Sequence, residues 1–334
     1  MQRRYVVTGS GGQLGRCLVR SLSSPSPPAR WDDGGCLVAA FAHADLDIAD
    51  PDAVAQIFDG LEGGPPDVLV NAAAYNAVDA CEGEGRVIAE RVNGDAPRML
   101  AEACARVGAR FVHVSTDYVL QGDSPAALPE NAAPAPTSAY GRSKLAGERG
   151  VLAASADALV VRTSWVFGPG KNFVGTMLRQ ARLRRSGDVA GPMRVVADQW
   201  GCPTYAADLA DGIRGLVAAT RPGDRNGGIY HLCNSLPAAQ AGGTTWWDFA
   251  RAILDAQGYE DIEIEKVSCA NFHTAAKRPR YSLLGVERAA SLGVQMRPWP
   301  LALAAFMAST DLSVTREMTD PDYVAERVRA EGGR

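Results

Sequence analysis

The feature of this 334-residue chain that most constrains its fold is a glycine-rich turn close to the amino terminus. The turn follows a short apolar run, and Gly9, Gly12 and Gly15 stand three residues apart within it. In such a turn the first glycine allows a tight bend, the second lets a pyrophosphate approach the backbone, and the third lets helix and strand pack. Free amides at the helix start face the anion. The turn therefore predicts a nucleotide-binding unit, although any strand-to-helix connection can use glycine.

Short β-branched runs alternate with amphipathic segments along the first half of the chain. We expect strands at 4–8, 37–41, 68–71, 110–115 and 158–162, and helices near 14–22, 53–61, 87–107 and 138–153. This alternation is typical of βαβ units and a parallel sheet. The predicted fold class is α/β, with a doubly wound, Rossmann-like parallel sheet.

The pattern changes after Gly168, where segments punctuated by Arg, Pro, Trp and Gly replace the regular alternation. We therefore predict two lobes. Residues 1–167 with 205–234 are expected to form a dinucleotide-binding lobe, and residues 168–204 with 235–310 a smaller, mixed α/β substrate lobe. Residues 311–334 carry ten charged side chains and are expected to be a charged, solvated tail or a loosely docked helix without a function.

The charge and hydropathy of the chain argue against two classes of partner. Lys and Arg total 34 against 38 Asp and Glu, a net charge of −4. This balance disfavours nucleic acid, because phosphate binding needs a basic surface. Apolar stretches such as 301–308 are much shorter than the roughly 20 residues that span a bilayer. We expect neither a nucleic-acid nor a membrane partner.

The seven cysteines are odd in number, scattered, and never spaced Cys-x-x-Cys. This usage is typical of free thiols in a reducing compartment rather than of disulfides or a zinc site. The histidines also lack metal-ligand spacing, and His113 within a strand is expected to be a packed side chain rather than a catalyst. We therefore expect a cytoplasmic protein without a metal site.

Two further segments are expected beside the glycine turn. The segment 45–48 follows the second strand, where a carboxylate can accept a hydrogen bond from an adenine amino group. The segment 71–74 ends the third strand in small side chains, which leave room for a ribose. Either could be an ordinary loop alone, but at successive strand ends they favour a bound dinucleotide.

A candidate catalytic group follows the fourth strand. Thr116 ends that strand, and Tyr140 and Lys144 are four residues apart on the next helix, so they share one helix face. A lysine ammonium near a phenol lowers the phenol pKa from about 10 towards neutrality. We expect Thr116 to hold a substrate carbonyl and Tyr140 to give it a proton.

Several longer strings carry a family resemblance. They are Asn-Ala-Ala-Ala-Tyr-Asn-Ala-Val-Asp (71–79), Ser-Thr-Asp-Tyr-Val (115–119), Tyr-x-x-x-Lys with Leu-Ala-Gly-Glu (140–148), Arg-Thr-Ser-Trp-Val-Phe (162–167), Asp-Gln-Trp-Gly-Cys-Pro-Thr (198–204), Gly-Thr-Thr-Trp (243–246), and Arg278-Pro279 with Ser282 and Leu283. With the glycine turn, they resemble the extended short-chain dehydrogenases/reductases. More closely, the chain resembles the dTDP-4-dehydrorhamnose reductase group and related deoxysugar 4-ketoreductases. The resemblance runs from residue 5 to about 305.

This resemblance implies NADPH-dependent reduction, with NADH possible, of the C4 ketone of a dTDP-4-keto-6-deoxyhexose, for dTDP-rhamnose or a secondary-metabolite deoxysugar. The implied catalytic residues are Thr116, Tyr140 and Lys144. The implied cofactor contacts are Gly9, Gly12, Gln13, Leu14 and Gly15 at the pyrophosphate, Asp47 and Ile48 at the adenine, Ala74, Tyr75 and Asn76 at the ribose, and Val114, Tyr140 and Lys144 at the nicotinamide half. The implied substrate contacts are Thr116, Asp117, Trp165 and Arg278. The chain is expected to be a monomer or a homodimer.

The chain departs from the family at two positions. Some members carry, two residues past the third glycine, an acidic residue that joins a magnesium-bridged dimer; here the residue is Cys17, so neither metal nor dimer is implied. The second strand ends in Phe41-Ala42-His43, where nothing repels a 2′-phosphate. No arginine is clearly placed to receive that phosphate either, unless Arg16 turns towards it.

Three alternatives stay open. A dehydratase or epimerase is disfavoured, because dehydratases of this superfamily follow the active threonine with Asp-Glu and here Tyr118 follows Asp117. A non-catalytic, NADP-binding regulatory subunit is disfavoured by the intact Thr116, Tyr140 and Lys144. Trp165 is equally compatible with a core position and with stacking on a sugar.

Overall fold

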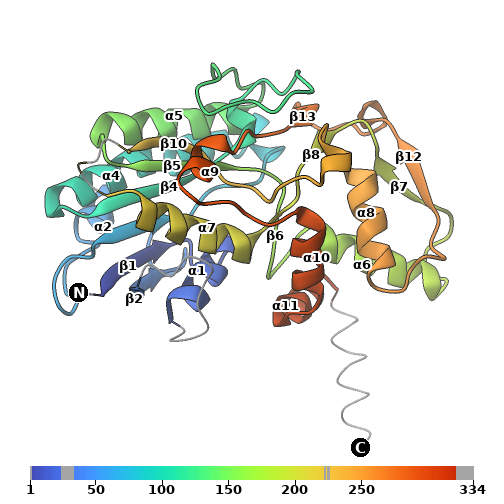
Figure 1. The fold of residues 1–334 in the computed structure, drawn as a ribbon, viewed down its shortest axis with the longest axis horizontal. Coiled ribbons are helices and arrows are strands. Elements are labelled where there is room, and N and C mark those ends of the chain that lie inside the picture. The colour runs from blue at the N-terminus through green and yellow to red at the C-terminus, as the bar shows by residue number, and fades with distance from the viewer. Residues whose placement is uncertain (1, 24–33, 222, 224–225, 321–334) are drawn as a thin grey trace, which may run out of the picture.

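The computed structural model describes residues 2–23, 34–221, 223 and 226–320 of the chain. Its centre is a six-stranded parallel sheet in the order β10-β5-β4-β3-β1-β2 (Figure 1). The strands are β1 (Arg3–Thr8), β2 (Gly35–Phe41), β3 (Val68–Asn71), β4 (Arg110–Thr116), β5 (Leu159–Thr163) and β10 (Gly228–His231). The predicted α/β class with a doubly wound parallel sheet is confirmed.

Helices cover both faces of this sheet (Figure 1). They are α1 (Gln13–Ser23) and α7 (Ala206–Ala219) on one face, with α2 (Pro51–Ala55), α4 (Ala96–Val107) and α5 (Ala139–Ala154) on the other. Successive residues of β1 serve opposite faces: Val7 packs in the core formed with α1 and α7, and Val6 in the core formed with α4 and α5. In the strand order, β2 pairs with one edge of β1 and β3 with the other, so the ends of β1 and β3 form a switch point of the sheet.

The segment predicted as one helix at 87–107 is interrupted. It begins as α3 (Arg86–Ala89), widens into a π-helical stretch at Glu90–Asp95 and continues as α4. Pro97 lies in the first turn of α4, where its missing N–H is tolerated. In the middle of one continuous α-helix the same proline would remove a backbone hydrogen bond, so the helix is interrupted before it. Helix α4 ends at Gly108, whose φ of 73° is left-handed.

A second group of elements lies beyond the carboxyl ends of the sheet (Figure 1). Its helices are α6 (Phe173–Arg185), α8 (Trp246–Asp255), α10 (Trp299–Met307) and α11 (Thr310–Thr319), and its strands are β6 (Val166–Phe167), β7 (Met193–Val196), β8 (Trp200–Gly201), β9 (Thr204–Tyr205), β11 (Thr244–Thr245), β12 (Ile264–Val267) and β13 (Tyr281–Ser282). Phe167, Phe249 and Phe306 centre a separate aromatic core here. Helix α9 (Glu287–Ser291) lies outside this group, because it packs beside β10 on the first core. In the described part of the chain, no helix is long and apolar enough to cross a membrane.

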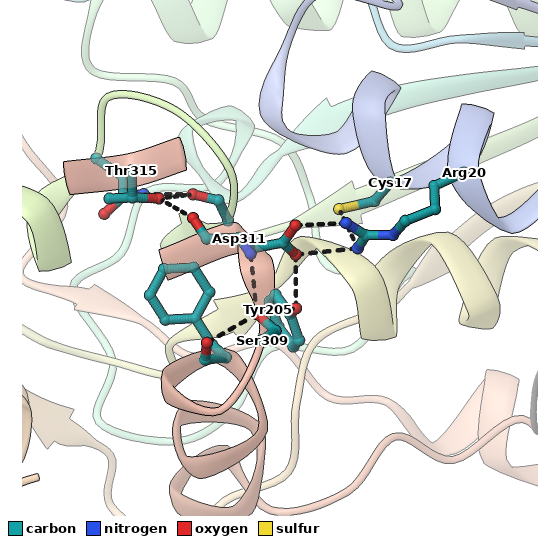
Figure 2. Close-up of polar contacts among 9 residues, drawn as sticks. Cys17, Arg20, Tyr205, Ser309, Asp311 and Thr315 are labelled. Carbon is teal, nitrogen blue, oxygen red and sulfur yellow. Dashed lines mark hydrogen bonds and ion pairs between the residues drawn. The ribbon is translucent and has the colours of Figure 1, made fainter. Parts of the chain in front are cut away.

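Of the two alternatives predicted for the charged segment from residue 311, the structure has a docked helix rather than a solvated tail where it describes the segment. Residues 310–319 form the packed helix α11, in which Asp311, Leu312 and Thr315 are buried. The Asp311 carboxylate accepts hydrogen bonds from the Arg20 guanidinium of α1, at 3.0 Å, and from the Tyr205 hydroxyl, at 2.6 Å (Figure 2). A solvated tail is therefore wrong for 311–320, because polar contacts dock a helix that has few apolar residues. Residues 321–334 lie outside the described chain.

Candidate functional site

A cavity of about 680 Å³ lies between the carboxyl ends of the central strands and the second group of elements. Ligands of open α/β sheets bind at this edge. The cavity is lined by many of the predicted site residues, namely Gly12, Gln13, Leu14, Ala74, Asn76, Val114, Thr116, Asp117, Tyr140, Lys144, Trp165 and Arg278. The fold thus brings residues together from widely separated parts of the sequence.

The three glycines of the turn have different local environments. Gly9 has a φ of 72°, and a Cβ there would overlap the backbone of Ala73 on the neighbouring strand end. A Cβ at Gly15 would overlap the carbonyl of Gly9. A Cβ at Gly12 would lie 3.3 Å from the same carbonyl, which is tight but not overlapping, and Gly12 lines the cavity. Gly9 and Gly15 are thus required by the turn itself, whereas Gly12 leaves its backbone open to a ligand.

Five predicted cofactor contacts lie outside the cavity lining: Gly9 and Gly15, which shape the turn, and Asp47, Ile48 and Tyr75. Asp47 is exposed and its carboxylate accepts a hydrogen bond from the amide of Ala49, while Ile48 is buried in the core beside the sheet. The backbone of Tyr75 is held by the Asn93 side chain, and its ring lies against Gly85. The adenine and ribose contacts of these residues therefore stay predictions.

Tyr140 lies in the first turn of α5, which Ser138 caps by accepting a hydrogen bond from the amide of Gly141. Its ring packs edge-to-face on Tyr118, with centroids 5.4 Å apart, and its hydroxyl donates to Oδ1 of Asn76 at 3.3 Å. Burial and the nearby Asp117 charge raise the pKa of Tyr140, against a smaller effect of the Thr116 hydrogen bond. The phenol is therefore a protonated, buried acid that faces the cavity.

Lys144 is directed towards β4 rather than towards the phenol. Its ammonium donates to the carbonyl of Val114 at 2.7 Å and lies 3.4 Å from Nε2 of His113. Burial lowers the pKa of Lys144 to about 8, although the Glu148 charge raises it. The prediction that Lys144 lowers the pKa of Tyr140 stays a prediction. In the structure the Lys144 ammonium donates to β4, and burial is the largest influence on the pKa of the phenol.

Thr116 and Asp117 meet at the end of β4. The Thr116 hydroxyl donates to Oδ1 of Asp117 at 3.0 Å and accepts from the amide of Tyr118 at 3.3 Å. Burial raises the pKa of Asp117 to about 6, while hydrogen bonds with Ser282 and Thr116 act in the opposite direction. A carboxyl group that titrates near neutrality therefore lies beside the phenol of Tyr140.

Aromatic and charged side chains form the far wall of the cavity. Trp165 has a φ of 47° and stacks on Trp246 with ring centroids 3.7 Å apart, so it is part of a stacked wall that lines the cavity rather than of a closed core. Arg278 forms an ion pair with Asp79 at 2.6 Å, which joins the second group of elements to the loop after β3. The position of Trp246 in this wall was not predicted, although the residue ends the Gly-Thr-Thr-Trp string. The capping box of Thr245 and Asp248 at the start of its helix is a local signal in the sequence.

Two departures from the family can be placed in the structure. Cys17 is buried, with its sulfur 3.7 Å from the Arg20 guanidinium (Figure 2). Arg16 donates to the carbonyl of Gly11 at 2.9 Å and is exposed beside the turn. Among the described residues, no three His, Cys, Asp or Glu side chains are grouped as metal ligands would be.

Comparison with known proteins places the chain among enzymes with the expected activity. The family model described as RmlD substrate binding domain matches residues 3–312. The dTDP-4-dehydrorhamnose reductase of Mycobacterium tuberculosis is 40% identical over 313 residues, which cover 92% of this chain and 93% of that protein. A Streptomyces antibioticus protein named probable dTDP-4,6-dihydroxy-2-methyloxan-3-one 4-ketoreductase is 39% identical over 306 residues, covering 90% and 93%.

A solved structure agrees with these sequence matches. The dTDP-4-dehydrorhamnose reductase of Bacillus anthracis, in complex with NADP, superposes with a TM-score of 0.77 at 35% sequence identity, covering 92% of this chain and 99% of that one. Because the family model and these relatives extend over nearly the whole chain, the resemblance found in the sequence motifs is confirmed. This chain belongs to the family of the RmlD substrate binding domain and the dTDP-4-dehydrorhamnose reductases.

Proposed function

We propose that this chain reduces the C4 ketone of a dTDP-4-keto-6-deoxyhexose with NADPH. The observation that carries the proposal is the buried phenol of Tyr140, which faces the cavity beside Thr116 and Asn76. The relatives named as dTDP-4-dehydrorhamnose reductase and as a 4-ketoreductase support the substrate class. The product serves dTDP-rhamnose or another deoxysugar.

The glycine turn and the adjoining strand ends fit a dinucleotide. The amides at the start of α1 suit a pyrophosphate, and Gln13, Leu14 and Val114 line the same cavity. When bound, NADPH supplies the hydride for C4. The Bacillus anthracis relative in complex with NADP supports NADPH over NADH, and exposed Arg16 suits a 2′-phosphate.

The chemical steps fall to three side chains. We assign the Thr116 hydroxyl to the substrate carbonyl, which it orients for reduction. Tyr140 is the general acid that gives its phenolic proton to the oxygen at C4, a role for which its raised pKa keeps it protonated. Lys144 lies on the same face of α5 as Tyr140 and is buried at the cavity, and we assign its amine to the nicotinamide half of the cofactor.

The remaining cavity residues suit the nucleotide of the substrate. We propose that Trp165, stacked on Trp246, packs against the sugar or base, and that Asp117 contacts the sugar. Arg278, held at the cavity by Asp79, binds the diphosphate.

Tyr118 favours reduction over dehydration. At the position where a dehydratase of this superfamily needs a glutamate, this side chain packs its ring against Tyr140. The phenol of a tyrosine is protonated at neutral pH, so Tyr118 cannot act as the base that removes a proton from the sugar ring.

The proposal also covers organisation and location. We propose the two-lobe division at 167/168, 204/205 and 234/235, supported by the separate aromatic core around Phe249, although helix α9, on the second-lobe side of the division, packs on the core of the first. A cytoplasmic location is supported by the seven free cysteines. We propose a monomer or a homodimer.

A coupled assay tests this function. Purified protein is incubated with NADPH and a panel of nucleotide 4-keto-6-deoxysugars, NADPH loss is followed by absorbance, and product stereochemistry is read by NMR. We expect the parent protein to turn over a dTDP-4-keto substrate. Tyr140→Phe should retain only a residual rate, about 10²- to 10⁴-fold lower. Formation of a 4-keto product from dTDP-glucose and NAD would instead show a dehydratase, and failure on every ketosugar would favour a regulatory subunit.

A further inference from the structure

Four buried side chains form a hydrogen-bonded chain beneath the cavity. The Thr8 hydroxyl of β1 lies 2.7 Å from Oδ1 of Asn71, Nδ2 of Asn71 lies 3.2 Å from Nδ1 of His113, and Nε2 of His113 lies 3.4 Å from Nζ of Lys144. All four residues are at most 1% exposed. We call Thr8, Asn71, His113 and Lys144 the Lys144 chain.

The amide of Asn71 has a fixed orientation. Its Oδ1 accepts from the backbone amide of Ala73 at 3.1 Å, and a backbone amide can only donate. The NH₂ group of Asn71 must therefore point at Nδ1 of His113 and donate to it. In the neutral imidazole, the nitrogen that accepts carries no proton, so the proton of His113 lies on Nε2.

The imidazole is neutral at physiological pH. Burial lowers the pKa of His113 well below its usual value, and the charge of Lys144 lowers it further. Its Nε2–H then points at Nζ of Lys144, where an ammonium has only donors to offer. A neutral amine, in contrast, has a lone pair that accepts from Nε2–H while its own N–H donates to Val114.

We propose that His113 is a positioning residue for the reductase, which stabilises the neutral amine of Lys144 through its Nε2–H and thereby sets the pH range in which Lys144 carries a proton. The inference rests on the proposed function only for its consequence in turnover. It replaces the expectation that His113 is a packed side chain without influence on the chemistry.

The other groups around Lys144 act on the same proton. Glu148, one turn further along α5, favours the ammonium, but its carboxylate is held by Arg162 at 2.7 and 2.8 Å and by the Ser115 hydroxyl at 2.6 Å. Tyr140, one turn earlier, is a neutral phenol because its pKa is raised. His113 is thus the described neighbour of Nζ whose hydrogen bonding discriminates against the charged form.

Nuclear magnetic resonance tests the tautomer directly. In protein carrying ¹⁵N-labelled histidine, we expect His113 to show a protonated Nε2 and an unprotonated Nδ1 from pH 6 to pH 9. A protonated Nδ1 would overturn the proposal, because Nε2 would then accept from the ammonium and stabilise it. This measurement needs no turnover, so its failure is separate from any failure of the proposed function.

A His113→Gln variant tests the effect on Lys144. The carboxamide oxygen of glutamine can accept from the ammonium, so we expect the titration midpoint of Lys144, followed in ¹⁵N-lysine-labelled protein and assigned with Lys144→Arg, to rise by about one pH unit. The high-pH limb of kcat should move by the same amount, with the plateau kcat within a few-fold. His231→Gln is the matched control, because His231 is equally buried but bonds to the Gly285 carbonyl. A midpoint that stays unchanged, or that moves equally in His231→Gln, would overturn the proposal.

Discussion

Two buried polar clusters in this molecule are built from different groups. The Lys144 chain joins the ends of β1 and β3 to β4 and α5, and its Thr8, Asn71 and His113 are neutral groups that fix one another's hydrogen-bond directions. The second cluster, Arg20, Tyr205 and Asp311, joins α11 to α1 through full charges, and the Arg20 side chain is 48% exposed; we call it the α11 clamp. Burial alone therefore does not define a cluster's role. The first is expected to govern a proton, the second to hold elements together.

The largest effect is expected at Tyr140, the acid that the Lys144 chain adjoins. Tyr140→Phe removes one hydroxyl, and kcat should fall about 10²- to 10⁴-fold, because a positioned acid contributes that much. Substrate affinity should change only a few-fold, and the midpoint of thermal unfolding should stay close to the parent value. Steady-state kinetics and thermal melts decide this, and a parent rate in the variant would remove Tyr140 from the mechanism.

The next effect belongs to the α11 clamp. Asp311→Ala leaves Arg20 and the Tyr205 hydroxyl without their partner, and should lower the free energy of unfolding by about 2 kcal/mol, less than for a fully buried pair because Arg20 reaches solvent. The kcat of the folded protein should be unchanged. Denaturant titration measures the loss.

The exposed pair Arg98–Glu102 provides the control for the clamp. Arg98→Ala should cost only about 0.3–0.5 kcal/mol. Equal losses in the two variants would mean that burial of Asp311 adds nothing.

Helix α1 begins at the glycine turn and carries Arg20, so it connects the proposed cofactor site to the α11 clamp. Gly12→Val should weaken NADPH binding about tenfold, because the added side chain occupies the backbone surface assigned to the pyrophosphate, while its Cβ meets Gly9 without overlap. Fluorescence titration gives the affinity. Gly15→Val, which overlaps the Gly9 carbonyl, should instead unfold the turn. Unaltered NADPH affinity in Gly12→Val would contradict the cofactor site.

The smallest expected effect is a loss of stability with falling pH, which should begin at a higher pH for the buried histidines than for the α11 clamp. The pKa values of His113 and His231 are lowered, chiefly by burial, so the unfolded chain binds more protons below its own histidine pKa of about 6.5 and stability falls as the pH falls through that value. Together, the two histidines should lower the free energy of unfolding by about 1 kcal/mol between pH 7 and pH 6.

The clamp should respond only in stronger acid. Burial raises the pKa of Asp311, but hydrogen bonds from Arg20 and Tyr205 outweigh it, so the pKa lies below its usual value. The contribution of Asp311 is thus present above pH ~4 and lost below it. Unfolding curves of the parent and of His231→Gln across pH 3–7 test the order, and a loss that begins only below pH 4 would contradict the role of the histidines.

Local patterns predicted the sheet and much of the cavity. The glycine spacing, the β-branched runs and the four-residue step from Tyr140 to Lys144 are each set within one turn or strand, so the sequence displays them directly. The π-helical stretch at Glu90–Asp95 was missed because its apolar pattern resembles that of an α-helix.

Contacts between distant residues were not predictable in this way. Arg20 and Asp311 are 291 residues apart, and no periodicity relates them. The direction of Lys144 depends on His113, whose tautomer depends on Asn71 and Ala73 on another strand end. Residue type and spacing place such groups near one another, but the proton positions follow only from the completed network.

The docking of α11 on α1 also has a consequence for biosynthesis. A ribosome that adds about 5–20 residues per second needs roughly 15–60 s to pass from Arg20 to Asp311. Throughout that time helix α1 lacks the carboxylate that will bind its guanidinium. The clamp therefore forms late, and it joins two described helices, α1 and α11, whose synthesis is separated by most of this interval.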